Sequence, residues 1–133
     1  MALMRHLATL LAISVAVNTN QTGTTYSIIP SDSDKTDDAD MGFQVQISAS
    51  QTGGLTAPTT DLDIQTSVDK VNWVTVASMT QLTSSTSISE IKSISVLGPY
   101  VRAVTRVGGG TAPNHTATVT LMSSGSFKLQ AAA

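Results

Sequence analysis

Residues 61–77 read DLDIQTSVDKVNWVTVA, and this stretch decides the fold class. Its first half alternates the apolar residues Leu62 and Ile64 with polar ones, which is the period of a strand with one buried face. The turn-like residues 69–72 follow, and a second run rich in Val and Thr returns from Trp73. We therefore predict an antiparallel hairpin here.

The same alternation recurs on both sides of this hairpin. Loops with Gly and Pro separate further strand candidates at residues 24–29, 43–49, 88–96, 100–107 and 115–122. About seven or eight short strands favour an all-β fold, as an antiparallel β-sandwich or a jelly-roll-like barrel. The core predicted from the apolar positions comprises Phe43, Val45, Ile47, Leu62, Ile64, Trp73, Val101, Val119 and Leu121.

Composition agrees with a small β-protein. Thr, Val and Ile suit pleated surfaces and are frequent, whereas the residues that favour helices are sparse. A length of 133 residues indicates one domain. Within residues 1–133 we expect an N-terminal arm or strand (1–22), the sandwich core (23–122) and an extended C-terminal tail (123–133).

Charge and sulfur content exclude several kinds of function. The net charge is −2, only 12% of residues are charged, and no basic patch is visible, so binding to bare nucleic acid is not expected. The absence of Cys excludes disulfides, thiolate metal sites and a Cys nucleophile. A surface with so few charges is weakly protected from association, so we hypothesise that part of it is covered by copies of the chain or by a host surface.

The N-terminal segment has two interpretations. A basic start and the apolar run 7–17, with the small residues Ser14 and Ala16, imitate a secretory signal that would be removed. The run is too short to cross a membrane. Residues 13–18 alternate like a strand, and we favour retained structure, with the apolar side chains packing between subunits.

Catalytic groups are not indicated by the sequence. The two imidazoles are His6 and His115, and no Gly-x-Ser-x-Gly motif is present. His115 lies beside a Gly/Pro loop and is expected at the surface. Asp61 and Asp63 are expected on the solvent side of their strand rather than as a paired acid and base. No enzymatic activity, cofactor or small-molecule substrate is predicted.

An acidic segment follows Pro30. Its carboxylates are at alternating positions that suit calcium, which makes it a weak Ca²⁺ candidate consisting of Asp32, Asp34, Asp37, Asp38 and Asp40. The helix–loop–helix calcium pattern is not met, because Asp37 stands where that pattern needs Gly and no Glu closes the loop. A solvated loop is the simpler interpretation.

Aromatic and cationic side chains raise two further hypotheses. Arg102 and Arg106 share a strand face with Tyr100 and Val104, and this face could dock an acidic partner or be the polar side of a sheet. Trp73 is the only Trp and is expected to anchor the core through its large apolar area. The alternative for Trp73 is a ligand platform.

Residues 61–77, the downstream stretch GPYVRAV (98–104), a Gly-rich loop, Pro113 and a Thr/Val strand together resemble small β-sandwich proteins of tailed-bacteriophage virions. The resemblance covers roughly residues 43–122 and is to the capsid decoration or cement type. In that pattern Ser-x-Asp-Gly-x-x-Trp follows the strand, and Lys70 stands here where Gly is expected, which puts the tight turn in doubt. Sugar-binding discoidin-like modules carry a similar Asn-x-Trp hairpin.

The resemblance implies a non-enzymatic virion protein that stabilises the head by binding neighbouring copies of the major capsid protein. It also implies a homo-oligomer assembled in the host cytoplasm, with neither membrane nor nucleic acid as partner. The alternatives are another head–tail or tail accessory protein of the virion, and a secreted carbohydrate-binding module with a cleaved signal peptide. Residues expected at interfaces are Leu7, Leu10, Leu11, Ile13, Val15, Val17, Arg102 and Arg106.

Overall fold

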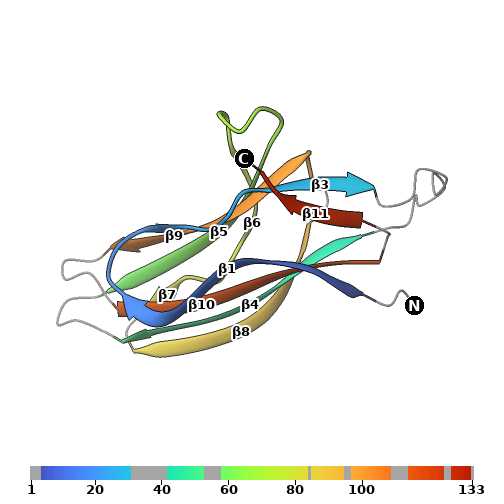
Figure 1. Cartoon of the computed structure of the whole chain (residues 1–133). Coiled ribbons are helices and arrows are strands. Elements are labelled where there is room, and N and C mark those ends of the chain that lie inside the picture. The colour runs from blue at the N-terminus through green and yellow to red at the C-terminus, as the bar shows by residue number, and fades with distance from the viewer. Residues whose placement is uncertain are drawn as a thin grey trace.

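The computed structural model describes residues 4–30, 42–52, 58–83, 85–94, 97–108, 114–124 and 127–132. Over these ranges the chain is all-β, and its strands form two antiparallel sheets that pack face to face (Figure 1). The predicted all-β class is confirmed, and the arrangement is a β-sandwich rather than a closed barrel. In this described part of the chain there is no helix of the length and apolarity needed to span a membrane.

One sheet has four strands in the order β1-β10-β4-β8. These strands are β1 (Arg5–Val17), β10 (Asn114–Ser123), β4 (Phe43–Thr52) and β8 (Thr86–Ile94). In the central pair, Val45 lies opposite Leu121 and Ile47 lies opposite Val119. The apolar positions of both strands therefore face the same side, which is the side turned toward the second sheet.

The second sheet has seven strands, and five follow the order β11-β3-β9-β5-β6. They are β11 (Phe127–Ala131), β3 (Tyr26–Pro30), β9 (Tyr100–Gly108), β5 (Thr59–Ser67) and β6 (Val74–Ser78). Two short strands complete it, β2 (Gln21–Thr22) beside β9 and β7 (Leu82–Thr83) beside β5. The β5–β6 pair confirms the predicted hairpin.

The core lies between the sheets and matches the sequence pattern closely. Seven of the predicted core residues are completely buried, namely Val45, Ile47, Leu62, Ile64, Val101, Val119 and Leu121. Phe43 is half-buried and packs against this cluster. The prediction for Trp73 is wrong: its ring is half-buried on the outside of the seven-stranded sheet, under the guanidinium of Arg102.

The N-terminal segment is a structural strand of the sandwich. Strand β1 pairs with β10 from Arg5 to Val17 and contributes Leu10 and Leu11, 1% and 7% exposed, to the core. The chain then crosses to the other sheet in a close approach: a Cβ at Gly23 would lie 2.1 Å from the backbone oxygen of Leu10. A side chain is thus excluded at this crossing.

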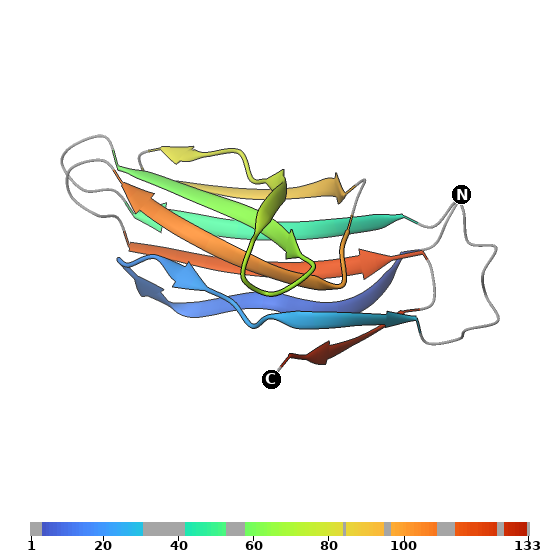
Figure 2. The same ribbon diagram turned by 90° about the horizontal axis from the view of Figure 1, so that it is seen from above.

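The C-terminal segment is not a free tail. Residues 127–131 form β11, which pairs antiparallel with β3. Figure 2 shows β11 at the margin of the sandwich with the C-terminal end beyond it. The prediction of an extended tail over 123–133 is therefore wrong for β11, because its backbone groups find partners along β3.

Candidate interaction surfaces

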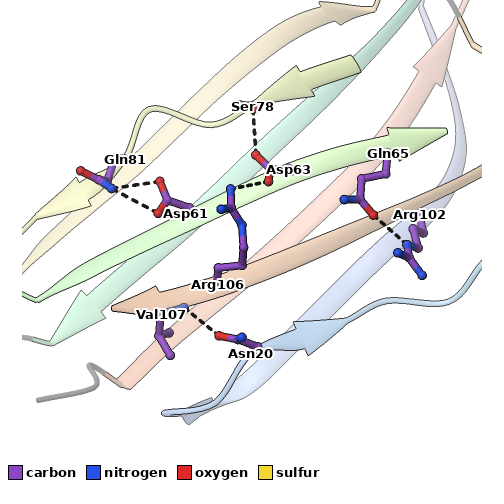
Figure 3. A network of polar contacts seen from close by, with 9 residues as sticks. All are labelled: Asn20, Asp61, Asp63, Gln65, Ser78, Gln81, Arg102, Arg106 and Val107. Atoms are coloured by element: carbon purple, nitrogen blue, oxygen red, sulfur yellow. Dashed lines mark hydrogen bonds and ion pairs between the residues drawn. The ribbon is translucent and has the colours of Figure 1, made fainter. Parts of the chain in front are cut away.

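The outer face of the seven-stranded sheet carries a network of paired charges and amides (Figure 3). Asp63 accepts hydrogen bonds from Arg106 Nη2 and, at 2.8 Å, from the hydroxyl of Ser78. Asp61 accepts two bonds from Gln81 Nε2 at 3.0 and 3.1 Å. The two acidic side chains are thus on the outer face, as predicted, but Asp63 is only 8% exposed because its partners cover it.

The two arginines of this face have partners within the chain. Arg102 Nε donates to Gln65 Oε1 at 2.8 Å, and its guanidinium lies 4.1 Å from the centroid of the Trp73 ring. Arg106 is paired with Asp63, although its side chain stays 58% exposed. Docking of an acidic partner through both arginines remains a prediction, and such a partner would have to compete with these contacts.

The turn that joins β5 to β6 is fixed by two side chains. The carboxylate of Asp69 accepts backbone N–H bonds from Asn72 at 2.8 Å and Val71 at 2.9 Å, and the Asn72 side chain donates to its other oxygen at 2.9 Å. Ser67 Oγ accepts the N–H groups of Asp69 and Lys70 at 3.1 and 2.9 Å. The bond from Asn72, followed by that from Val71, holds the pKa of Asp69 well below its usual range.

Lys70 occupies the position where the resemblance predicts Gly. Its φ is 63°, in the left-handed region that glycine adopts most easily. The turn therefore forms with the expected geometry although the residue is not Gly. Two local contacts accompany it: Lys70 Nζ lies 5.3 Å from the centroid of the Tyr100 ring, and Trp73 Nε1 donates to the Lys70 carbonyl at 3.2 Å.

Three valines of the hairpin are exposed. Val68 and Val71 are each 76% exposed and Val74 is 63% exposed. Figure 1 shows the β5–β6 hairpin rising from the seven-stranded sheet on the side away from the four-stranded sheet. Sequence reasoning missed this apolar tip, because alternation places Val68 and Val74 in strands. The available signal was a valine inside a turn, at position 71.

The outer face of the four-stranded sheet is uncharged across β4, β8 and β10. Its outward positions on these strands are occupied mainly by Ser, Thr and Gln. Neighbouring strands exchange hydroxyl bonds here, Ser48 with Ser89 at 3.2 Å and Ser50 with Thr116 at 2.7 Å. A shallow, open depression of about 430 Å³ lies among these rows. The described outward positions of these three strands carry no charged side chain, and His6 of β1 lies beside them, opposite Met122.

The edge strands of both sheets have features that disfavour pairing with a strand of another chain. Strand β1 has three register shifts, and β6 and β11 are five residues long. On β8, Glu90 and Lys92 lie opposite the buried residues Ile47 and Val45, so both charges are on the inward side of an edge strand. Short, bulged and inwardly charged edges disfavour strand addition.

His115 is buried, which corrects the prediction of a surface residue. It is 1% exposed, and its Nε2 lies 3.0 Å from Thr105 Oγ1. Thr105 Oγ1 accepts the N–H of Gln21, so its own hydrogen is available for the imidazole. Burial lowers the pKa of His115 below its usual 6.5, and a backbone contact with Val17 opposes this shift only in part. The alternation that places Ala117 and Val119 inward includes His115 and was the missed signal.

Leu10 and Leu11 are the interface predictions that the structure contradicts. Both belong to the core of their own chain, because β1 pairs with β10 along its length. Leu7 and Ile13 are partly buried against that core, and Val17 is half-buried. Val15 is 78% exposed and is the one large apolar side chain of this strand that is exposed.

The acidic segment with Asp32, Asp34, Asp37, Asp38 and Asp40 lies outside the described residues. Among the residues that are described, no group of three or more His, Asp or Glu side chains could hold a metal ion. Comparisons with protein-family models, curated proteins and solved structures found no match to this chain.

Proposed function

We propose that this chain is a non-enzymatic structural protein of a tailed-bacteriophage virion, of the capsid decoration type. The observation that carries the proposal is the arrangement of the segments with the virion-protein resemblance. Residues 61–77 and 98–104 supply β5, β6 and the start of β9, which are adjacent in one sheet. Two of the segments that carry the resemblance are therefore neighbours in one sheet, whereas the Thr/Val strand that follows them is β10 of the other sheet.

The physical character of the molecule supports an assembly role. Two antiparallel sheets with a closely packed core make a rigid body, and Asp61, Asp63, Arg102 and Arg106 of the seven-stranded sheet each have a side-chain partner within the chain. Blocked edges favour contact through side chains rather than through added strands. Such a body suits repeated docking on the major capsid protein, and a homo-oligomer would multiply the contacts.

The proposal is tested on purified particles of the phage that encodes the chain. Quantitative mass spectrometry measures its copy number relative to that of the major capsid protein. A copy number that scales with the capsid subunits supports decoration. A copy number equal to the number of subunits in a single ring would assign the protein to the head–tail or tail parts. Absence of the protein from particles would contradict a virion role.

A further inference from the structure

The valine tip of the β5–β6 hairpin, Val68, Val71 and Val74, is not required by the turn that displays it. The turn is specified by Ser67 and Asp69, which together accept four backbone N–H bonds. None of these bonds involves a valine side chain, so polar residues at the three positions would satisfy the same backbone. Three exposed apolar side chains within residues 68–74 of one protruding hairpin indicate an interaction site.

The tip is preorganised for binding. Seven hydrogen bonds lie within residues 67–73, and the flanking rings of Tyr100 and Trp73 are held under cationic groups. A segment that is already ordered loses little conformational entropy when it binds. This favours the tip over a flexible arm as the element that enters a partner.

The charges around the tip define the chemistry of the partner. Lys70 belongs to the turn itself. Arg102 is not counted with it, because Arg102 and Trp73 lie on the outer face of the sheet, whereas Val74 pairs with Thr66 on the other face. The one acid of the turn, Asp69, has its oxygens directed at N–H donors of the turn. The tip thus combines exposed valines with one cation, Lys70, and its complement is an apolar pocket with carboxylates at its rim.

We propose that Val68, Val71 and Val74 are the docking tip of this protein and insert into such a pocket on a capsid subunit, with Lys70 facing the carboxylates. The inference rests on the proposed function, since that function supplies the capsid as the partner. It also replaces Leu10 and Leu11 as the apolar residues that reach another molecule.

A second copy of the chain is a poorer occupant. Two tips meeting each other would bring two Lys70 side chains together, and like charges at a contact are unfavourable. Three shallow depressions of the described surface, near Ser50, near Thr22 and near Phe43, are lined without any Asp or Glu. They lack the carboxylate rim that the tip requires.

The experiment measures binding of purified full-length protein to shells assembled from the major capsid protein of the same phage. The test variant is V68S/V71S/V74S, and the control is I29S/I91S, which changes two exposed aliphatic residues elsewhere. We expect the test variant to bind at least about 100-fold more weakly and the control to bind like the wild type. K70E should weaken binding about tenfold, whereas K128E, at an exposed position on β11, should not.

Each outcome separates this inference from the proposed function. If the wild type does not bind shells, the capsid-decoration function is wrong. If the wild type binds and the test variant binds equally well, the function stands and the docking tip is wrong. Sedimentation showing wild-type self-association that the test variant loses would assign the tip to a second copy. Tip-dependent binding to vesicles of anionic phospholipid, without binding to shells, would assign it to a membrane.

Discussion

Strand β1 and the β5–β6 hairpin show opposite relations between apolar sequence and exposure. The run of β1 is the most apolar segment of the chain, yet Leu10 and Leu11 are buried within the same sandwich. The hairpin has a polar turn sequence, yet the apolar residue Val71 within it is 76% exposed. A strand that pairs along its whole length can bury its apolar side, whereas a turn has no opposing sheet to cover its side chains.

The largest effect on stability is expected from a substitution at a buried position of β1. Leu10→Ala should lower the free energy of unfolding by about 2–5 kcal/mol, because it leaves a cavity at a fully buried site. Val15→Ser, on the same strand but 78% exposed, should stay within about 0.5 kcal/mol of the wild type. Chemical denaturation of both variants measures the difference. Equal effects would mean that β1 is not held in the core.

Acidification should lower the free energy of unfolding through the buried imidazole of His115. Because burial lowers the pKa of His115 in the folded state, the unfolded chain binds the proton more readily. The contribution of His115 to the free energy of unfolding is therefore fully present above the usual pKa of about 6.5. It decreases as the pH falls below that value. Urea midpoints between about pH 8 and 5.5 measure this loss above the carboxyl range.

His115→Gln is the control for this pH dependence, since Gln cannot be protonated. Its stability should be nearly constant over the same interval. A wild-type curve that is equally flat would contradict the burial of the imidazole.

Substitutions at Lys70, the turn residue with a positive φ, test the backbone conformation of the hairpin. Lys70→Val should lower the free energy of unfolding by about 1–2 kcal/mol, because β-branched side chains are disfavoured at a φ of 63°. Lys70→Gly accepts this conformation freely and should not destabilise by as much. Thermal melting of the pair provides the test, and the reverse ranking would contradict the left-handed turn.

The smallest effect is expected at the valine tip. V68S/V71S/V74S removes three aliphatic side chains, but each is largely exposed, so each change should alter stability by no more than about 0.5 kcal/mol. Chemical denaturation compares the free energy of unfolding of this triple variant with that of Leu10→Ala. A large loss of stability would show that the valines serve the fold, and the docking tip would then lose its basis.

The turn at Lys70 shows how far local sequence reasoning extends. The order of two strand patterns around the turn-like residues 69–72 was sufficient to predict a hairpin. The same order did not reveal that Trp73 lies outside the core. That position depends on Arg102, which comes from another strand and covers the ring.

Alternation by itself determined the all-β class and seven completely buried core residues, because a strand directs successive side chains to opposite faces whatever its neighbours are. Only the tertiary structure decided which apolar residues stay exposed. Leu10 is buried and Val71 is not because β1 lies along β10, while the hairpin extends beyond the sheet. Such long-range pairing is a property of the whole chain, and the local pattern of one segment does not contain it.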